Sequence, residues 1–265
     1  MEMTFAVLVQ ICLDRIKQAK ANLIYLLGAN DAGKSTLAKE LANQLVLEGK
    51  KVAIIDADTG QSSRLPLTLS LNYANEQFGT FSELVLADWY FMPSYNLLGC
   101  FQRYIKLVKR WTKKAKEEAD FCLVDSNGDV RKWLKLKEIE TLNPDLVIAL
   151  QRKAELEPIL QNLPRGILKV PVPQEVKHKS SKLRKEARNE KLKLYFNNSR
   201  GRTIKHETPF DFTQRIVGLY SQGKFLGLGI AKDGNTAELR VMTPVGAKVD
   251  KVEFSSVKLE EALWQ

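Results

Sequence analysis

A glycine-rich phosphate-binding motif constrains this chain more than any other feature of its sequence. Residues 28–35 read G-A-N-D-A-G-K-S and satisfy the pattern G-x-x-x-x-G-K-[ST]. The motif follows the apolar run Leu23–Leu27 and precedes a helical pattern from Lys34 to about Leu47, which Gly49 closes. Buried strand, glycine-rich turn and helix in this order are the setting in which the pattern binds nucleotide phosphates, so we expect ATP or GTP here.

Each part of the motif has a chemical role in holding a triphosphate. Backbone N–H groups and the helix N-terminus cradle the phosphates. The Lys34 ammonium reaches the β and γ oxygens, and the Ser35 hydroxyl coordinates Mg²⁺. The predicted phosphate-binding residues of the motif are Gly28, Ala29, Asn30, Asp31, Ala32, Gly33, Lys34, Ser35 and Thr36.

Two carboxylates follow the next buried strand. The apolar run Val52–Ile55 leads into Asp56 and Asp58, whose side chains project on one face because strand residues two apart point the same way. A P-loop site needs an acidic residue to complete its Mg²⁺ site, and either aspartate can serve. The predicted Mg²⁺ ligands are therefore Ser35, Asp56 and Asp58.

Apolar runs alternating with helical patterns predict the fold class. We expect an α/β fold with a doubly wound, mostly parallel P-loop NTPase sheet and a small C-terminal antiparallel β domain. The strand-like runs lie at 89–91, 121–124, 146–150 and 167–170, followed beyond a basic linker at 199–202 by runs at 213–220, 225–231, 237–243 and 251–259. The expected domains are an N-terminal helix within 1–22, a P-loop domain at 23–198 and a β domain at 203–265.

The positive charge is concentrated in two segments. The chain carries 41 Lys and Arg against 31 Asp and Glu, a net charge of +10. Eleven basic residues but only Glu186 and Glu190 lie between Lys177 and Lys205, and a second basic cluster lies along the helical pattern at 103–116. Such segments bind polyanions or form solvated helix faces, and charge alone leaves both alternatives open.

Composition limits the class and location of the protein. With 44% apolar residues the chain is able to bury a core, and no apolar run approaches the ~20 residues of a membrane span. The N-terminus lacks the basic region and cleavage site of a signal peptide, which predicts a soluble, cytoplasmic protein without membrane partners. Cys12, Cys100 and Cys122 are spaced too widely for a zinc motif, so we expect reduced thiols and no metal beyond Mg²⁺.

The P-loop class is narrowed by motifs that are missing. The sequence has no Asn-Lys-x-Asp element for reading guanine and no Leu-Ser-Gly-Gly signature of transporter ATPases. Ala29 and Asn30 occupy the positions where a ParA-like ATPase has an early lysine. A kinase remains, and it needs basic residues over the γ-phosphate and a groove for the acceptor.

The chain resembles the polynucleotide 5′-hydroxyl kinase family over about residues 23–259. The resemblance is carried by 28–36, by Asp58-Thr-Gly-Gln61-Ser62, by Asp125-Ser126-Asn127-Gly128, and by 142–150 with 155–158. It continues through 179–196, which is similar to the family's lid, and into the β tail at 216–219 and 241–245. That family includes RNA kinases of eukaryotic pre-mRNA cleavage and ribosomal RNA processing complexes, and smaller archaeal and bacterial members.

The resemblance implies an ATP- and Mg²⁺-dependent transfer of the γ-phosphate to the 5′-hydroxyl of single-stranded RNA, or of DNA, and RNA-processing proteins as partners. It implies that Lys34, Asp58 and Arg184 are catalytic, with Asp58 activating the hydroxyl. The implied lid spans about 177–196 and places Lys179, Arg184 and Arg188 near ATP. The residues that it implies for the RNA acceptor are Gln61, Ser94, Ser126 and Gly128.

Two departures from the family pattern are informative. Asp129 stands where several members have an aromatic residue for stacking the terminal base, so that contact is missing or comes from another ring such as Trp133. Lys179 stands where an arginine, the better bidentate phosphate ligand, is usual. These departures keep two alternatives open, a catalytically weak ATP-binding scaffold for RNA processing and a P-loop kinase of a small metabolite.

The lid segment has two stripes at helical spacing. Arg184, Arg188 and Lys191 fall at i, i+4 and i+7 and share one face of a helix. We expect the apolar stripe formed by Leu183, Ala187 and Leu194 to dock on the core, which leaves the basic stripe for the triphosphate.

Overall fold

The computed structural model describes residues 4–164, 166–205, 213–234 and 237–259. Its helices are α1 (Phe5–Ala19), α2 (Lys34–Leu47), the 3₁₀ turn η1 (Leu97–Cys100), α3 (Phe101–Glu118), α4 (Lys132–Leu142), α5 (Glu157–Leu160) and α6 (Ser181–Phe196). Its strands are β1 (Leu23–Gly28), β2 (Val52–Ala57), β3 (Thr68–Ala74), β4 (Val85–Phe91), β5 (Phe121–Ser126), β6 (Leu146–Gln151), β7 (Ile167–Pro171), β8 (Arg200–Lys205), β9 (Arg215–Ser221), β10 (Lys224–Gly234), β11 (Glu238–Thr243) and β12 (Lys251–Lys258). Positions 1–3, 206–212, 235–236 and 260–265 of the expected N-terminal segment and β domain lie outside the described residues.

The chain divides into two compact units. The first comprises residues 1–58, 70–88 and 102–180, and the second comprises 59–69, 89–101 and 181–265. The second unit thus takes in two internal segments, the ends of β3 and β4 with the residues beside them, together with α6 and the C-terminal strands.

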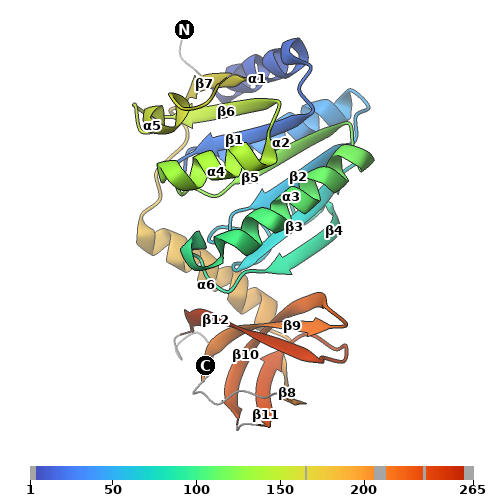
Figure 1. Ribbon diagram of the computed structural model, residues 1–265. Coiled ribbons are helices and arrows are strands. Elements are labelled where there is room, and N and C mark those ends of the chain that lie inside the picture. Colours follow the sequence, from blue (N-terminus) through green and yellow to red (C-terminus); the bar gives the residue numbers. More distant parts are fainter. Residues whose placement is uncertain (1–3, 165, 206–212, 235–236, 260–265) are drawn as a thin grey trace. The chain divides into compact units, whose positions relative to one another are not determined.

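The first sheet confirms the predicted fold class. Its seven strands lie in the order β4-β3-β2-β5-β1-β6-β7 (Figure 1). The pairs β1 with β5, β1 with β6, β2 with β5 and β6 with β7 are parallel, whereas β3 pairs antiparallel with β2. Every residue of β1 and β2 is buried, as expected for strands with helices on both faces.

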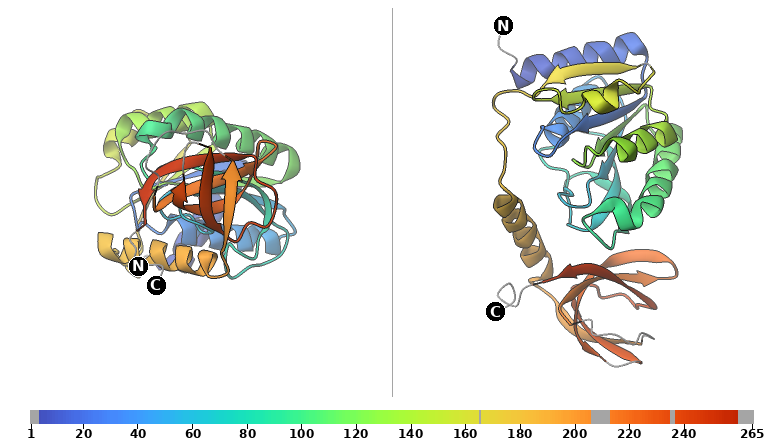
Figure 2. Two further views of the ribbon diagram at one scale, coloured as in Figure 1. Left: turned by 90° about the horizontal axis from the view of Figure 1, so that it is seen from below. Right: turned by 60° about the vertical axis from the view of Figure 1, so that its left-hand side comes forward.

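Helices cover both faces of this sheet because the apolar side chains of each strand point alternately to one face and the other. Ile24, Leu26 and Ile54 belong to a core that α1 and α2 complete with Leu8, Leu37 and others. On the other face, Tyr25 of β1 meets α4, and Figures 1 and 2 show α3 and α4 side by side there. Thr4 caps α1, because its hydroxyl accepts a hydrogen bond from Val7 N at 3.4 Å.

The second unit contains the antiparallel sheet. Its order is β12-β9-β10-β11-β8, and all its described pairings are antiparallel. One core joins Leu65, Leu67 and Phe91 with apolar residues of β9 and β10 and with Leu192 and Phe196 of α6.

Three features differ from expectation. Strand β3 was not predicted, and the basic linker at 199–202 is the start of β8, which pairs with β11 at the edge of the described sheet. In α6, the apolar stripe does not dock, because Leu183 and Leu194 are 53% and 77% exposed. The helix instead buries Leu192 and Phe196. Its basic side also packs against the second unit, because Lys191 donates to a backbone carbonyl and Arg188 lies over the Tyr95 ring.

Two further findings concern the cysteines and the helices of the described residues. Cys12, Cys100 and Cys122 are buried free thiols. None of the described helices is long and apolar enough to cross a membrane.

Candidate active site

The phosphate-binding motif forms the turn between β1 and α2. β1 ends at Gly28, and Gly33 adopts a left-handed conformation with φ of 87° immediately before α2 begins at Lys34. That φ favours glycine, because a Cβ at this conformation is strained. The turn therefore presents its backbone and the start of α2 on the same side, as an anion site requires.

Lys34 is bent back onto its own loop. Its Nζ donates to the carbonyl oxygens of Gly28 and Ala29, each at 2.9 Å, and the residue is only 6% exposed. Burial lowers the pKa of this ammonium, while the negative charges of Asp125 and Asp58 oppose the shift. An ammonium held in this way has lost much of its hydration, so a phosphate oxygen is a strong replacement for the carbonyls.

The sheet register brings acidic residues to the same edge. Asp125 at the end of β5 is level with Leu26 on one side and with Asp56 on the other. Asp56 and Asp125 are each 1% exposed, and Asp58 N donates to Asp56 Oδ1 at 3.3 Å. The carboxyl ends of parallel strands, where ligands bind in such sheets, thus carry three aspartates beside the phosphate loop.

Asp125 is the residue of this site to which sequence reasoning gave no role. Its carboxyl is buried, and no described residue gives its Oδ1 a hydrogen-bond partner. Burial and the charge of Asp56 raise its pKa to about 7, although the Lys34 charge and a hydrogen bond from Ser35 act to lower it. Its position at the end of the apolar run 121–124, like that of Asp56 after 52–55, was the signal that could have identified it.

These oxygen atoms fit a magnesium ion. Among the described residues, no group of three or more His, Cys, Asp or Glu side chains is close enough together to hold a metal by itself. Mg²⁺ in nucleotide sites uses only one or two carboxylates and takes its other ligands from phosphates and water. The Ser35 hydroxyl, Asp56, Asp58 and the unsatisfied oxygen of Asp125 suit that chemistry.

The loop after β5 packs against the phosphate loop. A Cβ on Gly128 would lie 2.0 Å from Asn30 Oδ1 and 2.7 Å from Asn30 N, so only glycine permits this contact. Ser126 is fully buried, and its hydroxyl donates to Leu26 O at 2.7 Å. Ser126 and Gly128, two of the predicted acceptor residues, therefore shape the edge of the sheet. Their contact with RNA stays a prediction.

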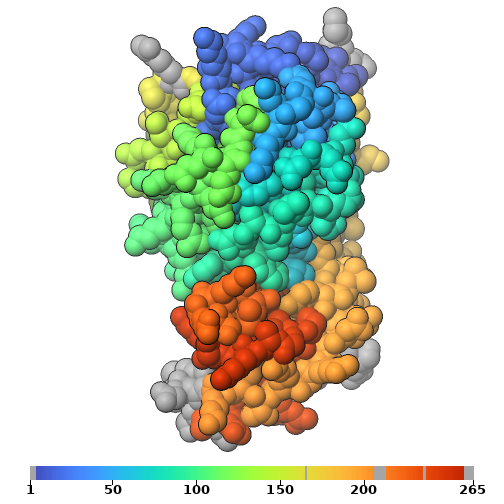
Figure 3. Space-filling model, turned by 90° about the vertical axis from the view of Figure 1, so that its right-hand side faces the viewer, coloured from blue at the N-terminus to red at the C-terminus, as the bar shows by residue number. Residues whose placement is uncertain are grey.

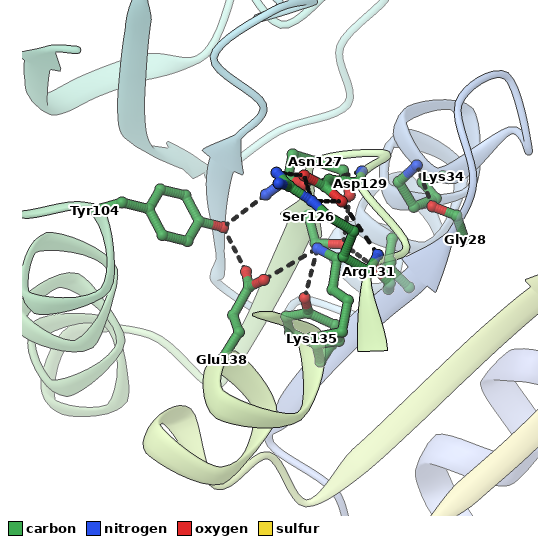
Figure 4. A network of polar contacts seen from close by, with 11 residues as sticks. Gly28, Lys34, Tyr104, Ser126, Asn127, Asp129, Arg131, Lys135 and Glu138 are labelled. Carbon is green, nitrogen blue, oxygen red and sulfur yellow. Dashed lines mark hydrogen bonds and ion pairs between the residues drawn. The ribbon is translucent and has the colours of Figure 1, made fainter. Parts of the chain in front are cut away.

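A buried polar network supports that loop from beneath (Figure 4). Lys135 Nζ on α4 lies 3.0 Å from both Glu138 Oε2 and the Tyr25 hydroxyl. The Tyr104 hydroxyl of α3 donates to Glu138 and accepts from Asn127 Nδ2 at 3.3 Å. All of these side chains are buried, and Asn127 in turn holds the following turn, because its Oδ1 accepts from Asp129 N at 3.0 Å.

Asp129 and Arg131 complete this turn. Arg131 N and Nε donate to Asp129 Oδ1 at 3.1 and 2.9 Å. Asp129, where the family resemblance led us to expect an aromatic residue, is thus engaged by an arginine, while Trp133 at the start of α4 is 52% exposed.

Arg152 and Lys179, which come much later in the chain, hold the phosphate loop in place. Arg152 donates to Asp31 O at 2.7 Å and to Val176 O at 3.1 Å. Lys179 contacts the loop through its backbone, because its N–H donates to Asp31 Oδ2 at 3.1 Å. The role predicted for its side chain at ATP stays a prediction, and Arg152 had no signal in the sequence beyond its position after a strand.

The second unit gathers the remaining predicted residues. Lys191 Nζ of α6 donates to the carbonyl oxygens of Ser62 and Ser63 at 2.6 and 3.2 Å, next to Gln61. The Arg188 guanidinium lies 4.8 Å from the ring centre of Tyr95, next to Ser94. Arg184 lies one turn before Arg188 on the same helix. Within this unit, α6 of the predicted lid therefore contacts the segments that contain Gln61 and Ser94, whereas Ser126, Gly128 and Lys179 belong to the first unit.

Comparisons with known proteins identify a matching family model and several relatives. The model of the family described as mRNA cleavage and polyadenylation factor CLP1 P-loop matches residues 28–198. The polyribonucleotide 5′-hydroxyl-kinase of Pyrococcus horikoshii is 37% identical over 185 residues, which are 68% of this chain and 51% of that protein. That of Methanocaldococcus jannaschii is 38% identical over 195 residues, 71% of this chain and 54% of that protein. The chain spans about half the length of the curated relatives it matches.

More distant relatives cover more of the chain. The polyribonucleotide 5′-hydroxyl-kinase Clp1 of Xenopus laevis is 24% identical over 251 residues, 83% of this chain and 55% of that protein. The solved structure of a wild-type Clp1p–Pcf11p (454–563) complex is similar with a TM-score of 0.71 at 13% identity, covering 97% of this chain and 80% of that one. At this identity the likeness establishes the fold of both parts of the chain.

Removing one partner of the buried ion pair should destabilise the fold more than removing both. Lys135→Met leaves the Glu138 charge unpaired in the core, and we expect it to lower the free energy of unfolding by about 3–5 kcal/mol. The double variant Lys135→Met, Glu138→Leu should recover part of that loss. Urea unfolding of the wild type, both single variants and the double variant gives the coupling energy, and strictly additive losses would contradict the pairing.

Asp125→Asn should stabilise the nucleotide-free protein in a pH-dependent manner. The pKa of this carboxyl rises from about 3.9 in an unfolded chain to about 7 in the fold, so the folded state binds the proton more tightly. Wild-type stability should therefore fall as pH rises between these values, and the variant should not share that fall. Urea unfolding with EDTA should find the Asp125→Asn variant more stable than the wild type by about 1–4 kcal/mol at pH 8, with a smaller gap at pH 5. Equal gaps at both pH values would contradict the assignment.

Proposed function

This chain belongs to the mRNA cleavage and polyadenylation factor CLP1 P-loop family, and we propose that it transfers the γ-phosphate of ATP to the 5′-hydroxyl of RNA. The observation that carries the proposal is the edge of the first sheet, where the phosphate loop lies beside Asp125 of β5, Asp56 of β2 and Asp58 just after β2. A triphosphate site with spare carboxylates can bind a nucleotide and also accept a proton from an attacking hydroxyl.

The first unit's residues have distinct roles in this proposal. The backbone of residues 28–36 and the start of α2 bind the phosphates, and Lys34 leaves the carbonyls of Gly28 and Ala29 for the β and γ oxygens. Ser35 with Asp56 or Asp125 would hold Mg²⁺, and the bound ion would neutralise phosphate charge. A bound Mg²⁺ would offset the cost of burying the negative charges of Asp56 and Asp125.

Asp58 is the proposed acid–base residue. Unlike Asp56, it lies beyond the end of β2, where an acceptor can approach it. As the 5′ oxygen forms its bond to the γ-phosphorus, the bond from that phosphorus to the β-bridging oxygen breaks and ADP leaves. The hydroxyl proton passes to the Asp58 carboxylate, and positioning plus charge stabilisation supply the remaining catalysis.

The second unit's residues are proposed for the acceptor and the lid. Gln61 and Ser94 lie in segments tied to α6 through Lys191 and Arg188, so the acceptor strand and the lid would respond together. Arg184 and Arg188 supply cations for the triphosphate or for the RNA backbone, and Lys179 adds a third at the start of the lid. Single-stranded RNA, or DNA, is the proposed acceptor, and an RNA-processing protein is a proposed partner, as Pcf11p is for Clp1p.

Replacing Lys34 tests the phosphate site directly. Lys34→Ala should lower transfer of label from γ-labelled ATP to a 5′-hydroxyl oligoribonucleotide by at least ~10²-fold, because it removes a donor to the transferred group. The fold should persist, since the hydrogen bonds of Nζ within the described residues go to two loop carbonyls. Lys39→Ala on the same helix, whose side chain pairs with Glu40 at 3.3 Å, is the matched control and should keep wild-type turnover. Near-normal turnover of Lys34→Ala would refute the site.

The two aspartates after β2 should differ in kinetic effect. Asp58→Asn should lower kcat much more than it weakens ATP binding, because its proposed partner is the acceptor hydroxyl. Asp56→Asn should weaken Mg²⁺–ATP binding more strongly. Steady-state kinetics and calorimetric ATP titration separate the two effects, and the opposite pattern would exchange the two roles.

A further inference from the structure

Four lysines form a continuous stripe along α3. Lys106, Lys109, Lys113 and Lys116 fall at i, i+3, i+7 and i+10, which places them on one side of the helix. All four are exposed, and the green atoms of this helix form part of the surface in Figure 3. We call this set the α3 lysine stripe.

The stripe differs from the other charges on the same helix. Arg110 pairs with Asp88 at 3.0 Å and Lys114 pairs with Glu118 at 3.9 Å. Within the described parts of the chain, the four stripe lysines have no carboxylate within ion-pair distance. Like charges at these spacings cost ~0.2–0.5 kcal/mol per neighbouring pair in an isolated helix, a cost that a bound polyanion reverses.

The opposite side of α3 holds the stripe in a fixed orientation. Tyr104, Val108, Trp111 and Ala115 are buried, and Trp111 Nε1 donates to Asp88 Oδ2 at 2.8 Å. The helix therefore cannot rotate to bring the lysines to another surface. A rigid row of cations loses less entropy on binding a ligand than lysines on a mobile segment would.

One end of the stripe lies toward the phosphate site. The first turn of α3 contacts the loop after β5 through Tyr104 and Asn127, and Gly128 of that loop packs on Asn30 of the phosphate loop. From there α3 runs back across the sheet toward the start of β5, as Figure 1 shows. A strand whose 5′ end is at the phosphate site can therefore continue along this helix.

We propose that the α3 lysine stripe binds the phosphodiester backbone of the acceptor strand, several nucleotides from its 5′ end. This inference rests on the proposed 5′-kinase function. The ends of the stripe, Lys106 and Lys116, are ten residues apart, about 15 Å along the helix at 1.5 Å per residue. That length spans roughly four phosphates of a stacked strand at about 3.4 Å each. The stripe thus favours long acceptors over short ones without reading their sequence.

The length of the acceptor separates this role from a general loss of activity. The triple variant Lys106→Gln, Lys109→Gln, Lys113→Gln removes three charges and keeps residues of similar helix propensity. With a 5′-hydroxyl 15-mer, we expect KM and the Kd from fluorescence anisotropy to rise roughly tenfold or more. The slope of log K against log salt should become shallower by about 2, at about 0.7 per lost contact. With a dinucleotide acceptor, kcat and KM should match the wild type.

Matched controls isolate the position of the charges. Lys17→Gln, Lys20→Gln, Lys50→Gln removes three charges on or directly after α1 and α2, which cover the other face of the sheet, and should leave the 15-mer unaffected. Replacing the three stripe lysines by arginine should preserve binding.

Two results would overturn the proposal, and a third would separate it from the kinase function. Equal losses with dinucleotide and 15-mer, or none with either, would overturn it and leave the stripe for an acidic protein partner. Wild-type binding of the 15-mer with the expected salt dependence, but without transfer, would refute the kinase function and leave the stripe proposal supported.

Discussion

The parallel register of β5 between β1 and β2 is the constraint on which the site depends. It sets Asp125 level with Leu26 and Asp56, so the strand ends carrying acids meet the turn that carries Lys34. Because successive side chains of a strand point to opposite faces, a slip of β5 by one residue would turn Asp125 to the other face of the sheet. The hydrophobic pattern of the sheet thereby fixes the chemistry of its edge.

The first unit treats its buried charges in two opposite ways. Lys135 and Glu138 are fully buried but satisfied by each other and by two tyrosine hydroxyls, so they stiffen the support of the loop after β5. Asp125 and Lys34 are buried beside the phosphate loop with incomplete partners, which costs stability. A bound cation and phosphate would pair these charges and remove that cost, so binding of Mg²⁺ and ATP would stabilise the folded protein.

The sequence revealed the features that depend on local pattern. Motif and hydrophobic period predict the phosphate loop, the helices α1 and α2 and the strands β1, β2, β5, β6 and β7. The structure confirms all of these elements. Asp125 received no role because its importance comes from pairing across strands distant in sequence. β8 resembled a linker because an edge strand with exposed side chains has no apolar signature. The face of α6 was misjudged because arginine and lysine bury their stems while their charges reach carbonyls and rings.

The central claim is that this edge directs a phosphate from ATP to a 5′-hydroxyl. Mass spectrometry of an oligoribonucleotide after incubation with the protein, ATP and Mg²⁺ tests it most directly. The account predicts one added phosphate on the 5′-terminal nucleotide, and none when that end is already phosphorylated. ATP consumption with no change in the oligonucleotide, or a phosphate added at any other position, would contradict it.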